Sequence, residues 1–459
     1  MTRALVYGLA SLLAVVLPLV LAGWSPAFVS MSYGRSFLPF ELLGLSGGLL
    51  VAGVAWVELR RRRPAGAREW IAFAAPFLLA LHFLTLTSEY AQRRFDYDCY
   101  EYAGRALLAD ESPYRVGLIY LYPPPTAQAF AWAHRAVGAT ARALGADLPR
   151  DRVWDHVFYL YQCAQWLLVV AAYFLCLRFA RVVGLDAWWS PVLVGALLVF
   201  DNAVFRTLRH GQVNLWVLDL SLLGLLMARA RPWLGGAALA LAAHVKLYPL
   251  LAALALAAAD RWRAVLAGGV VLVAVFGLSS LGPGGLALWQ EYADLLRADF
   301  PGEIAFRNAS LHSLFYNLDR LWLGGSGRGG FVVWGVRLGT AAFALWLLAR
   351  LVLRERVRRS LEAAADEARV FAGHTADVLA FGLLLSPSVW EHHFVMALPL
   401  AILAIGERGR DRGVAVFAAV FAMLWMPTFD VFLLGHHRLA GMLVLLALTS
   451  PRRVPRYRT

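Results

Sequence analysis

One lysine stands among the 43 basic residues of this 459-residue chain, at a position where a cation is costly. Lys246 interrupts the apolar stretch LGGAALALAAHVKLYPLLAALALAAAD, which is typical of membrane-embedded helix. Its compact ammonium can meet a phosphate as a point charge, unlike the planar guanidinium of arginine. We therefore expect Lys246 to bind a phosphate at the membrane surface. The alternative is a lysine whose charged end only reaches interfacial water.

Two carboxylates, Asp96 and Asp98, directly follow an apolar segment in the motif Asp96-Tyr97-Asp98. Either could act as a general base at the outer boundary of a membrane, with Asp96 the first choice and Asp98 the second. Three other interpretations stay open at this point. The pair could be solvated boundary residues, an N-cap for a helix that begins near Tyr100, or a ligand pair for a hard metal ion.

Further polar side chains gather in short connections between apolar segments. Arg206, Arg209 and His210 are expected to help Lys246 with the phosphate. Amide and imidazole groups are expected to bind sugar hydroxyls or phosphate; they are Gln212, Asn214, His392 and His393. Adjacent histidines on a helix project in different directions, so a metal site at His392 and His393 is the lesser interpretation. We expect no metal and no cofactor.

This set of residues suits one kind of group transfer. A glycosidase needs two carboxylates, because the alcohol that leaves must be protonated. A sugar carried on a lipid phosphate leaves behind a stable phosphate, so one carboxylate suffices, as the base for the acceptor hydroxyl. The remaining requirement is cationic stabilisation of the leaving phosphate, which a lysine with nearby arginine and histidine can supply.

The composition predicts an all-α, polytopic integral membrane protein. Hydrophobic residues make up 60% of the chain, charged residues 16%, and mean hydropathy is +0.61. We expect about 12–14 transmembrane helices. Candidate spans are centred near Ala14, Val51, Leu79, Val169, Ala196, Leu220, Leu239, Ala253, Val273, Phe343, Leu383, Pro399, Val420 and Leu445. Those near Leu239, Ala253 and Pro399 are short enough to be half-helices.

Arginine placement orients these spans. Clusters such as Arg60–Arg63, Arg350–Arg359 and Arg452–Arg458 fall on alternate connections, and the positive-inside rule makes those connections cytoplasmic. Both termini are then predicted in the cytoplasm and the polar candidates at the outer face of the cell (inner) membrane. The net charge of +13 is thereby explained by topology, and we expect membrane lipids, not nucleic acid, as partners.

Three segments are predicted in chain order. Residues 1–89 hold N-terminal spans, residues 90–155 form an outward loop with juxtamembrane helices, and residues 156–459 complete a single membrane domain. Within the loop, an amphipathic helix is expected over Tyr100–Leu108, and Pro123–Pro125 begins a second helix that extends to about Leu144.

Several motifs in this order resemble glycosyltransferase family 87, from Asp96 to Glu407. They are Asp96 with Tyr100 and Ala103, Pro113-Tyr114, Tyr122-Pro123-Pro124, Gly211-Gln212-Val213-Asn214, Lys246, Asn308-Ala309-Ser310-Leu311, and Ser386-Pro387 with Trp390, His392 and His393. The resemblance implies a GT-C-like bundle and adds Tyr122 and Asn308 to the substrate-binding residues. Three predicted spans before Asp96, where one is usual, are a departure from the family.

The resemblance also implies a reaction. A hexose, typically mannose, would pass from a polyprenyl-phosphate donor to a glycolipid or glycan acceptor at the outer face, by single displacement with inversion. The rival from another class is a transporter or flippase for a lipid-linked or anionic solute. Polar residues concentrated at one face, and the lack of a visible inverted repeat, favour the enzyme.

Overall fold

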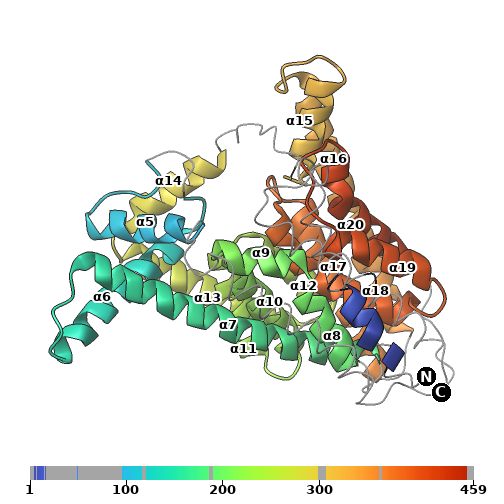
Figure 1. Ribbon diagram of the computed structural model, residues 1–459, viewed down its shortest axis with the longest axis horizontal. Coiled ribbons are helices and arrows are strands. Elements are labelled where there is room, and N and C mark those ends of the chain that lie inside the picture. Colours follow the sequence, from blue (N-terminus) through green and yellow to red (C-terminus); the bar gives the residue numbers. More distant parts are fainter. Residues whose placement is uncertain are drawn as a thin grey trace. The chain divides into compact units, whose positions relative to one another are not determined.

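The computed structural model describes residues 5–6, 8–14, 16, 49, 96–115, 120–185, 190–297, 307–360 and 364–451. Its regular elements are helices, as the composition predicts (Figure 1). The predicted spans near Val51 and Leu79, and nearly all of the predicted N-terminal segment 1–89, lie outside the described residues. Arg60–Arg63 and Arg452–Arg458 lie outside them too.

The chain divides into two compact units. The lysine unit comprises Gln92–Ala172 and Thr207–Pro301, and the C-terminal unit comprises Met1–Ala91, Tyr173–Arg206 and Gly302–Thr459. Helices α7 (Arg150–Val183) and α9 (Asn202–His210) each contribute residues to both units. The proposed division into segments 1–89, 90–155 and 156–459 stays a prediction.

Eight helical elements belong wholly to the lysine unit. They are α5 (Tyr97–Leu108), α6 (Pro124–Ala143), α10 (Asn214–Met227), α11 (Pro232–Val245), η3 (Tyr248–Leu251), α12 (Ala252–Ala258), α13 (Trp262–Ser280) and α14 (Gly285–Arg297).

The α5 helix starts three residues earlier than the sequence predicts, because Tyr97 and Tyr100 are both buried and both face the same aromatic core. Tyr97 packs edge-on to Phe158 with 4.8 Å between ring centroids, and Tyr100 stacks on Phe130 at 5.3 Å. The second predicted helix of this loop, α6, begins at Pro124 as expected, since proline suits the first helical turn. These aromatic contacts fix the first turn of α5, where Asp96 lies.

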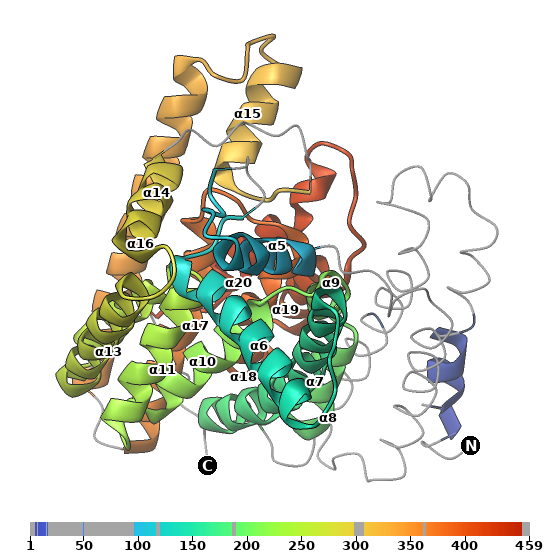
Figure 2. The ribbon, with the colours of Figure 1, turned by 90° about the vertical axis from the view of Figure 1, so that its left-hand side faces the viewer.

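Small residues hold α10, α11 and α13 side by side (Figure 2). A Cβ atom at Gly236 of α11 would collide with the Ala264 carbonyl oxygen of α13, so only glycine allows this approach. The α10 and α11 helices are antiparallel neighbours joined by a short turn. The start of α10, at Asn214, and the end of α11, beside Lys246, therefore lie at the same end of the pair.

The C-terminal unit is also helical. Its elements are α8 (Ser190–Val199), α15 (Leu311–Leu321), α16 (Gly330–Arg359), α17 (Ala364–Leu384), η4 (Glu391–Ala397), α18 (Leu398–Arg408), α19 (Gly413–Val420), the π-helical turn η5 (Phe421–Trp425), η6 (Leu434–His436) and α20 (His437–Leu448).

A buried ionic cluster holds α16, α17 and the end of α20 together. Asp377 accepts from Arg350 at 2.7 Å and from Arg354 at 2.8 Å, and all three side chains are at most 5% exposed. Both arginines also donate to the Thr449 carbonyl oxygen just beyond α20. The two arginines thus neutralise the buried Asp377 carboxylate and also supply hydrogen-bond donors to the C-terminal end of α20.

Among the described residues, three helices are long and apolar enough to cross a membrane: α7, α13 and α16. They contain the centres of the predicted spans near Val169, Val273 and Phe343 and are consistent with them. Shorter apolar helices of 10–17 residues lie at the predicted centres Leu220, Leu239, Ala253, Val420 and Leu445. The number of crossings therefore stays a prediction. The predicted span centre near Leu383 was wrong, because the helix there, α17, ends at Leu384, just before Ser386-Pro387.

Candidate active site

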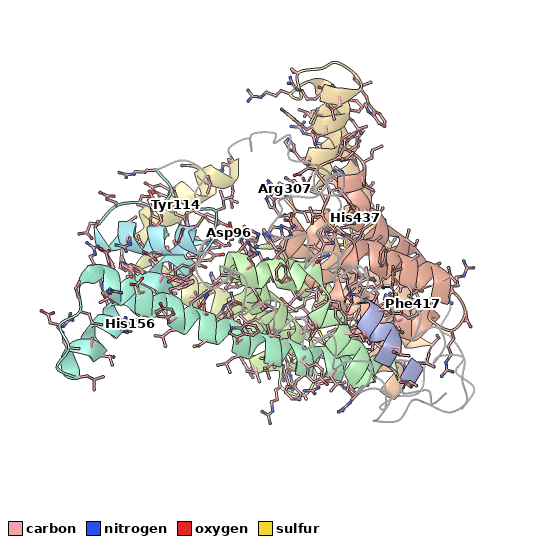
Figure 3. All side chains as sticks on the ribbon, in the orientation of Figure 1. Asp96, Tyr114, His156, Arg307, Phe417 and His437 are labelled. Carbon is pink, nitrogen blue, oxygen red and sulfur yellow. The ribbon has the colours of Figure 1, made fainter. Side chains whose placement is uncertain are left out.

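Asp96 is anchored by its backbone at the start of α5 (Figure 3). Its amide donates to the His210 carbonyl oxygen at 3.0 Å, which joins the start of α5 to the turn after α9. That turn passes through Gly211, whose φ of +66° favours glycine, and a Cβ there would lie 2.9 Å from the Tyr97 Cβ. Gly211 thus lets the Gly211-Gln212-Val213-Asn214 motif approach α5 closely.

Gln212 connects the carboxylate to two tyrosines. Its Nε2 donates to Asp96 Oδ2 at 2.6 Å, and its Oε1 accepts from Tyr122 at 2.9 Å and from Tyr100 at 3.3 Å. Burial raises the pKa of Tyr122 well above its ordinary value, so its hydroxyl keeps a proton to donate. The amide is therefore fixed with its donor toward Asp96.

Two residues that sequence reasoning missed hold the backbone of this motif. Gln165 Nε2 donates to the Gln212 carbonyl oxygen at 2.6 Å, and the Tyr161 hydroxyl donates to the Gly211 carbonyl oxygen at 2.7 Å. The signal that could have found them is their spacing, since Tyr161 and Gln165 are four residues apart and share one face of α7.

Lys246 caps the C-terminal end of α11 and points into the same set of side chains. Its Nζ donates to Asn214 Oδ1 at 2.6 Å and lies 5.6 Å from the centroid of the Tyr122 ring. The structure thus joins Asp96, Gln212, Tyr122, Asn214 and Lys246 in one polar network within the lysine unit.

Asp96 and Asp98 have different surroundings. The Asp96 side chain is 28% exposed, and His210 Nδ1 lies 3.9 Å from its Oδ2, close enough for an ion pair when the imidazole is protonated. Asp98 is exposed on the first turn of α5. The geometry therefore favours Asp96 over Asp98 as the residue joined to the polar network. Arg209 is buried in the same unit, and its predicted contact with phosphate stays a prediction.

The remaining predicted residues belong to the C-terminal unit. Arg206 is fully buried and pairs with Glu391 at 3.0 Å, a partner that the sequence analysis did not identify. Asn308 Oδ1 accepts from the amides of Ser310 and Val389, so its carbonyl joins two loops. Its role toward substrate stays a prediction, as does that of Arg206.

His392 and His393 lie in the 3-10 helix η4 with 4.5 Å between their ring centroids. His393 Nδ1 accepts from the Trp390 amide at 2.9 Å, which orients the imidazole within η4. Arg307 lies over the Trp390 ring at 5.5 Å and pairs with Asp430 at 3.5 Å. Within the described ranges, no three His, Cys, Asp or Glu residues come together as a metal-binding group.

The network in the lysine unit can perform two tasks side by side. Asp96 accepts from Gln212 through Oδ2, and a carboxylate of this kind can act as a general base toward a hydroxyl. Lys246 offers a mobile cation for an anionic group. One general base close to one ammonium group is what we expect a transfer of a sugar from a phosphate to require.

Comparison with known proteins agrees with this chemistry. The family model described as glycosyltransferase family 87 matches residues 120–387, more than half of the chain. A polyprenol-phosphate-mannose-dependent alpha-(1-2)-phosphatidylinositol mannoside mannosyltransferase of Mycolicibacterium smegmatis is 27% identical over 374 residues, covering 75% of this chain and 77% of the relative. The protein of the same description from Mycobacterium tuberculosis is 27% identical over 375 residues, covering 75% and 78%.

A third relative extends the comparison to another acceptor. A polyprenol-phosphate-mannose-dependent alpha-(1-2)-phosphatidylinositol pentamannoside mannosyltransferase of Mycolicibacterium smegmatis is 31% identical over 245 residues, covering 50% of this chain and 52% of the relative. No solved structure matches the chain.

Proposed function

This chain belongs to glycosyltransferase family 87 and is a membrane glycosyltransferase, and from that premise we propose that it moves mannose from a polyprenyl-phosphate donor to a glycolipid. The three relatives are named as mannosyltransferases that depend on polyprenol-phosphate-mannose, and their named acceptors are phosphatidylinositol mannosides. A mannosylated glycolipid of the cell envelope is accordingly the proposed acceptor. Nothing in these relatives favours the transporter alternative.

Asp96 is the proposed base. It takes the proton of the acceptor hydroxyl while that oxygen attacks the anomeric carbon, and the bond from that carbon to the phosphate oxygen breaks. Displacement in one step inverts the anomeric centre. Gln212, which donates to Asp96 at 2.6 Å, favours the ionised carboxylate that the step requires.

Lys246 is the proposed partner of the leaving phosphate. Negative charge grows on the phosphate as the bond breaks, so a cation nearby stabilises the transition state more than the bound donor. Asn214, which holds Lys246 Nζ at 2.6 Å, would keep the ammonium in place until the phosphate arrives. Arg209 and His210 are proposed to contribute to the same anion.

Four further predicted residues are proposed to take part in substrate binding. Asn308, His392 and His393 carry groups suited to sugar hydroxyls, and Arg206 supports them through its ion pair with Glu391, the residue that precedes His392. Tyr122 is proposed to contact the donor, since its ring lies under Lys246.

The proposed orientation follows from the arginine-rich connections. About 12–14 crossings of the cell membrane would place both termini in the cytoplasm and the Asp96 network at the outer face. A lipid-linked donor suits that face, because it is held by the bilayer and needs no soluble nucleotide-sugar pool.

The observation that carries the proposal is the junction of Asp96 and Lys246 through Gln212 and Tyr122. The test uses full-length protein in liposomes with radiolabelled mannose, supplied as polyprenyl-phosphate mannose or as its nucleotide-linked counterpart. We expect label in a glycolipid acceptor only from the lipid-linked donor. Transfer from the nucleotide sugar alone would refute the proposed donor.

Substitution tests the base separately. Asp96→Asn should leave insertion and donor binding intact and lower turnover by about 10²–10⁴. If Asp98→Asn is the more damaging change, the base lies two residues along. Equal loss from both variants, reversed by a high concentration of divalent cation, would instead indicate a metal site.

A further inference from the structure

The start of the α14 helix is held in place by hydrogen bonds from neighbouring side chains. Its entry turn has positive φ at Gly284 and Gly285, +78° and +57°, and Gln128 of α6 donates to two carbonyl oxygens there, at 2.8 Å to Ser279 and 3.0 Å to Pro283. Trp289 Nε1 donates to Ser279 Oγ at 3.2 Å, one turn into the helix. Gln128 and Trp289 therefore both hold the turn at the start of α14. The sequence analysis did not include this helix in the predicted site.

Glu291 of α14 contacts the segment that follows α5. One carboxylate oxygen accepts from the Ser112 hydroxyl, and the other accepts from Arg115 Nε and Nη2, both at 3.1 Å. The Glu291 side chain is 27% exposed, whereas that of Arg115 is 76% exposed. A carboxylate that binds two residues of one short segment fixes that segment more firmly than a single surface pair would.

Tyr114 lies between these two contacts and leads back to the site. Its ring packs against Tyr292, the neighbour of Glu291, with 5.7 Å between centroids. Its hydroxyl donates to the Tyr122 carbonyl oxygen at 2.7 Å, and the Tyr122 hydroxyl donates to Gln212. Burial, with Tyr292 and Glu291 close by, raises the pKa of Tyr114, so this donor stays protonated.

We propose that Glu291 is a positioning residue for Asp96, acting through the contacts of Ser112, Arg115 and Tyr114 to hold Tyr122 against Gln212. The inference rests on the proposed function only for the identity of the reaction that Asp96 serves. Without Glu291, the segment loses its carboxylate anchor, and Gln212 Oε1 loses the closer of its two donors, Tyr122 at 2.9 Å, while Tyr100 at 3.3 Å remains. The Gln212 amide is then held less firmly in the orientation that donates to Asp96. Ionised Asp96 is then less favoured, since it loses a hydrogen-bond donor.

The test compares Glu291→Ala with a matched control on the same helix. Asp294→Ala removes another carboxylate of α14, one that pairs with Arg297 at 2.9 Å and is 73% exposed. Both variants are studied as full-length protein in liposomes. Glu291→Ala should lower kcat about tenfold, leave KM for polyprenyl-phosphate mannose within about twofold, and move the acid limb of the pH profile about one unit upward. Asp294→Ala should do none of this.

Conservative replacement and hydrogen exchange complete the test. Glu291→Gln keeps an acceptor for Ser112 and should recover part of the lost turnover. Backbone amides of residues 109–115 should exchange faster in Glu291→Ala than in Asp294→Ala, a measurement that needs no substrate. Unchanged exchange, or faster exchange with an unmoved pH profile, would overturn the positioning role.

The two proposals fail in different ways. Wild-type protein that uses a different sugar donor would count against the proposed function, and the same variants assayed with that donor would still decide the role of Glu291. An unmoved profile in Glu291→Ala, alongside the loss expected from Asp96→Asn, would count against Glu291 alone.

Discussion

Replacing Gln212 by leucine removes the donor that Asp96 receives and leaves the backbone of the motif in place. The lost contact is 2.6 Å long and ends on a carboxylate, and hydrogen bonds to charged groups contribute about 1.5–3 kcal/mol. At about 1.4 kcal/mol for each unit of pKa, loss of this contact should raise the pKa of Asp96 by about one to two units.

The sign follows from the role of Asp96 as a base. Activity requires the ionised carboxylate, and Gln212→Leu favours the protonated form. The acid limb of the kcat/KM profile should therefore move to higher pH, and the variant should recover toward alkaline pH. Gln212→Glu should move the limb in the same direction, because a second carboxylate beside Asp96 also favours protonation.

Mannosyl transfer in liposomes, measured across the pH range from polyprenyl-phosphate mannose, provides the assay. Asn317→Leu is the control, since it removes another fully buried amide, one whose Nδ2 donates to the Ser313 carbonyl oxygen within α15. The control should lose stability and keep its profile. A folded Gln212→Leu protein with the wild-type acid limb would show that Gln212 does not govern the ionisation of Asp96.

Three further outcomes are expected. Lys246→Arg should insert normally yet lose most of its turnover, because the guanidinium differs from the ammonium in shape and reach; a fully active variant would leave Lys246 without a phosphate role. Burial, with Asp96 and Asp98 nearby, raises the pKa of Cys99 to about 11. In a protein with Cys163 and Cys176 replaced by serine, alkylation of Cys99 at pH 8 should therefore be about 10²-fold slower than that of an ordinary thiol. Asp96→Asn should speed that alkylation, and an unchanged rate would argue against an ionised Asp96. Impermeant thiol reagents should label Glu111→Cys from outside intact cells and spare Ala365→Cys, both in a background without native cysteines; labelling of both from one side would contradict the proposed topology.

The sequence alone determined the class of protein and much of the chemistry. Apolar runs of spanning length and arginine-rich connections indicate a polytopic helical membrane protein, because the bilayer allows few alternatives for such a chain. The lone lysine and the Asp96 motif pointed to a phosphate and a base for the same reason: isolated charges at a membrane are costly and are retained for function. The family match supports that class of enzyme, and the roles of Lys246 and Asp96 stay predictions.

Only the tertiary structure decided which of these residues meet. Gln212 and Asp96 are 116 positions apart, and their contact depends on the αL conformation of Gly211 and on aromatic packing around Tyr97. The choice of Asp96 over Asp98 depends on the same packing, since it sets which of two nearby carboxylates faces Gln212. No spacing rule reaches across that distance.

The pairing of Arg206 with Glu391 and of Glu291 with Ser112 and Arg115 also came from the fold. From the local sequence, a glutamate in an amphipathic helix is predicted to be a solvated surface residue. Only the folded chain shows its partners. Helix termini were hard to predict for a related reason. Tyr97 was added to α5 by burial against other aromatic rings, and that burial is a property of the packed chain and not of the local sequence.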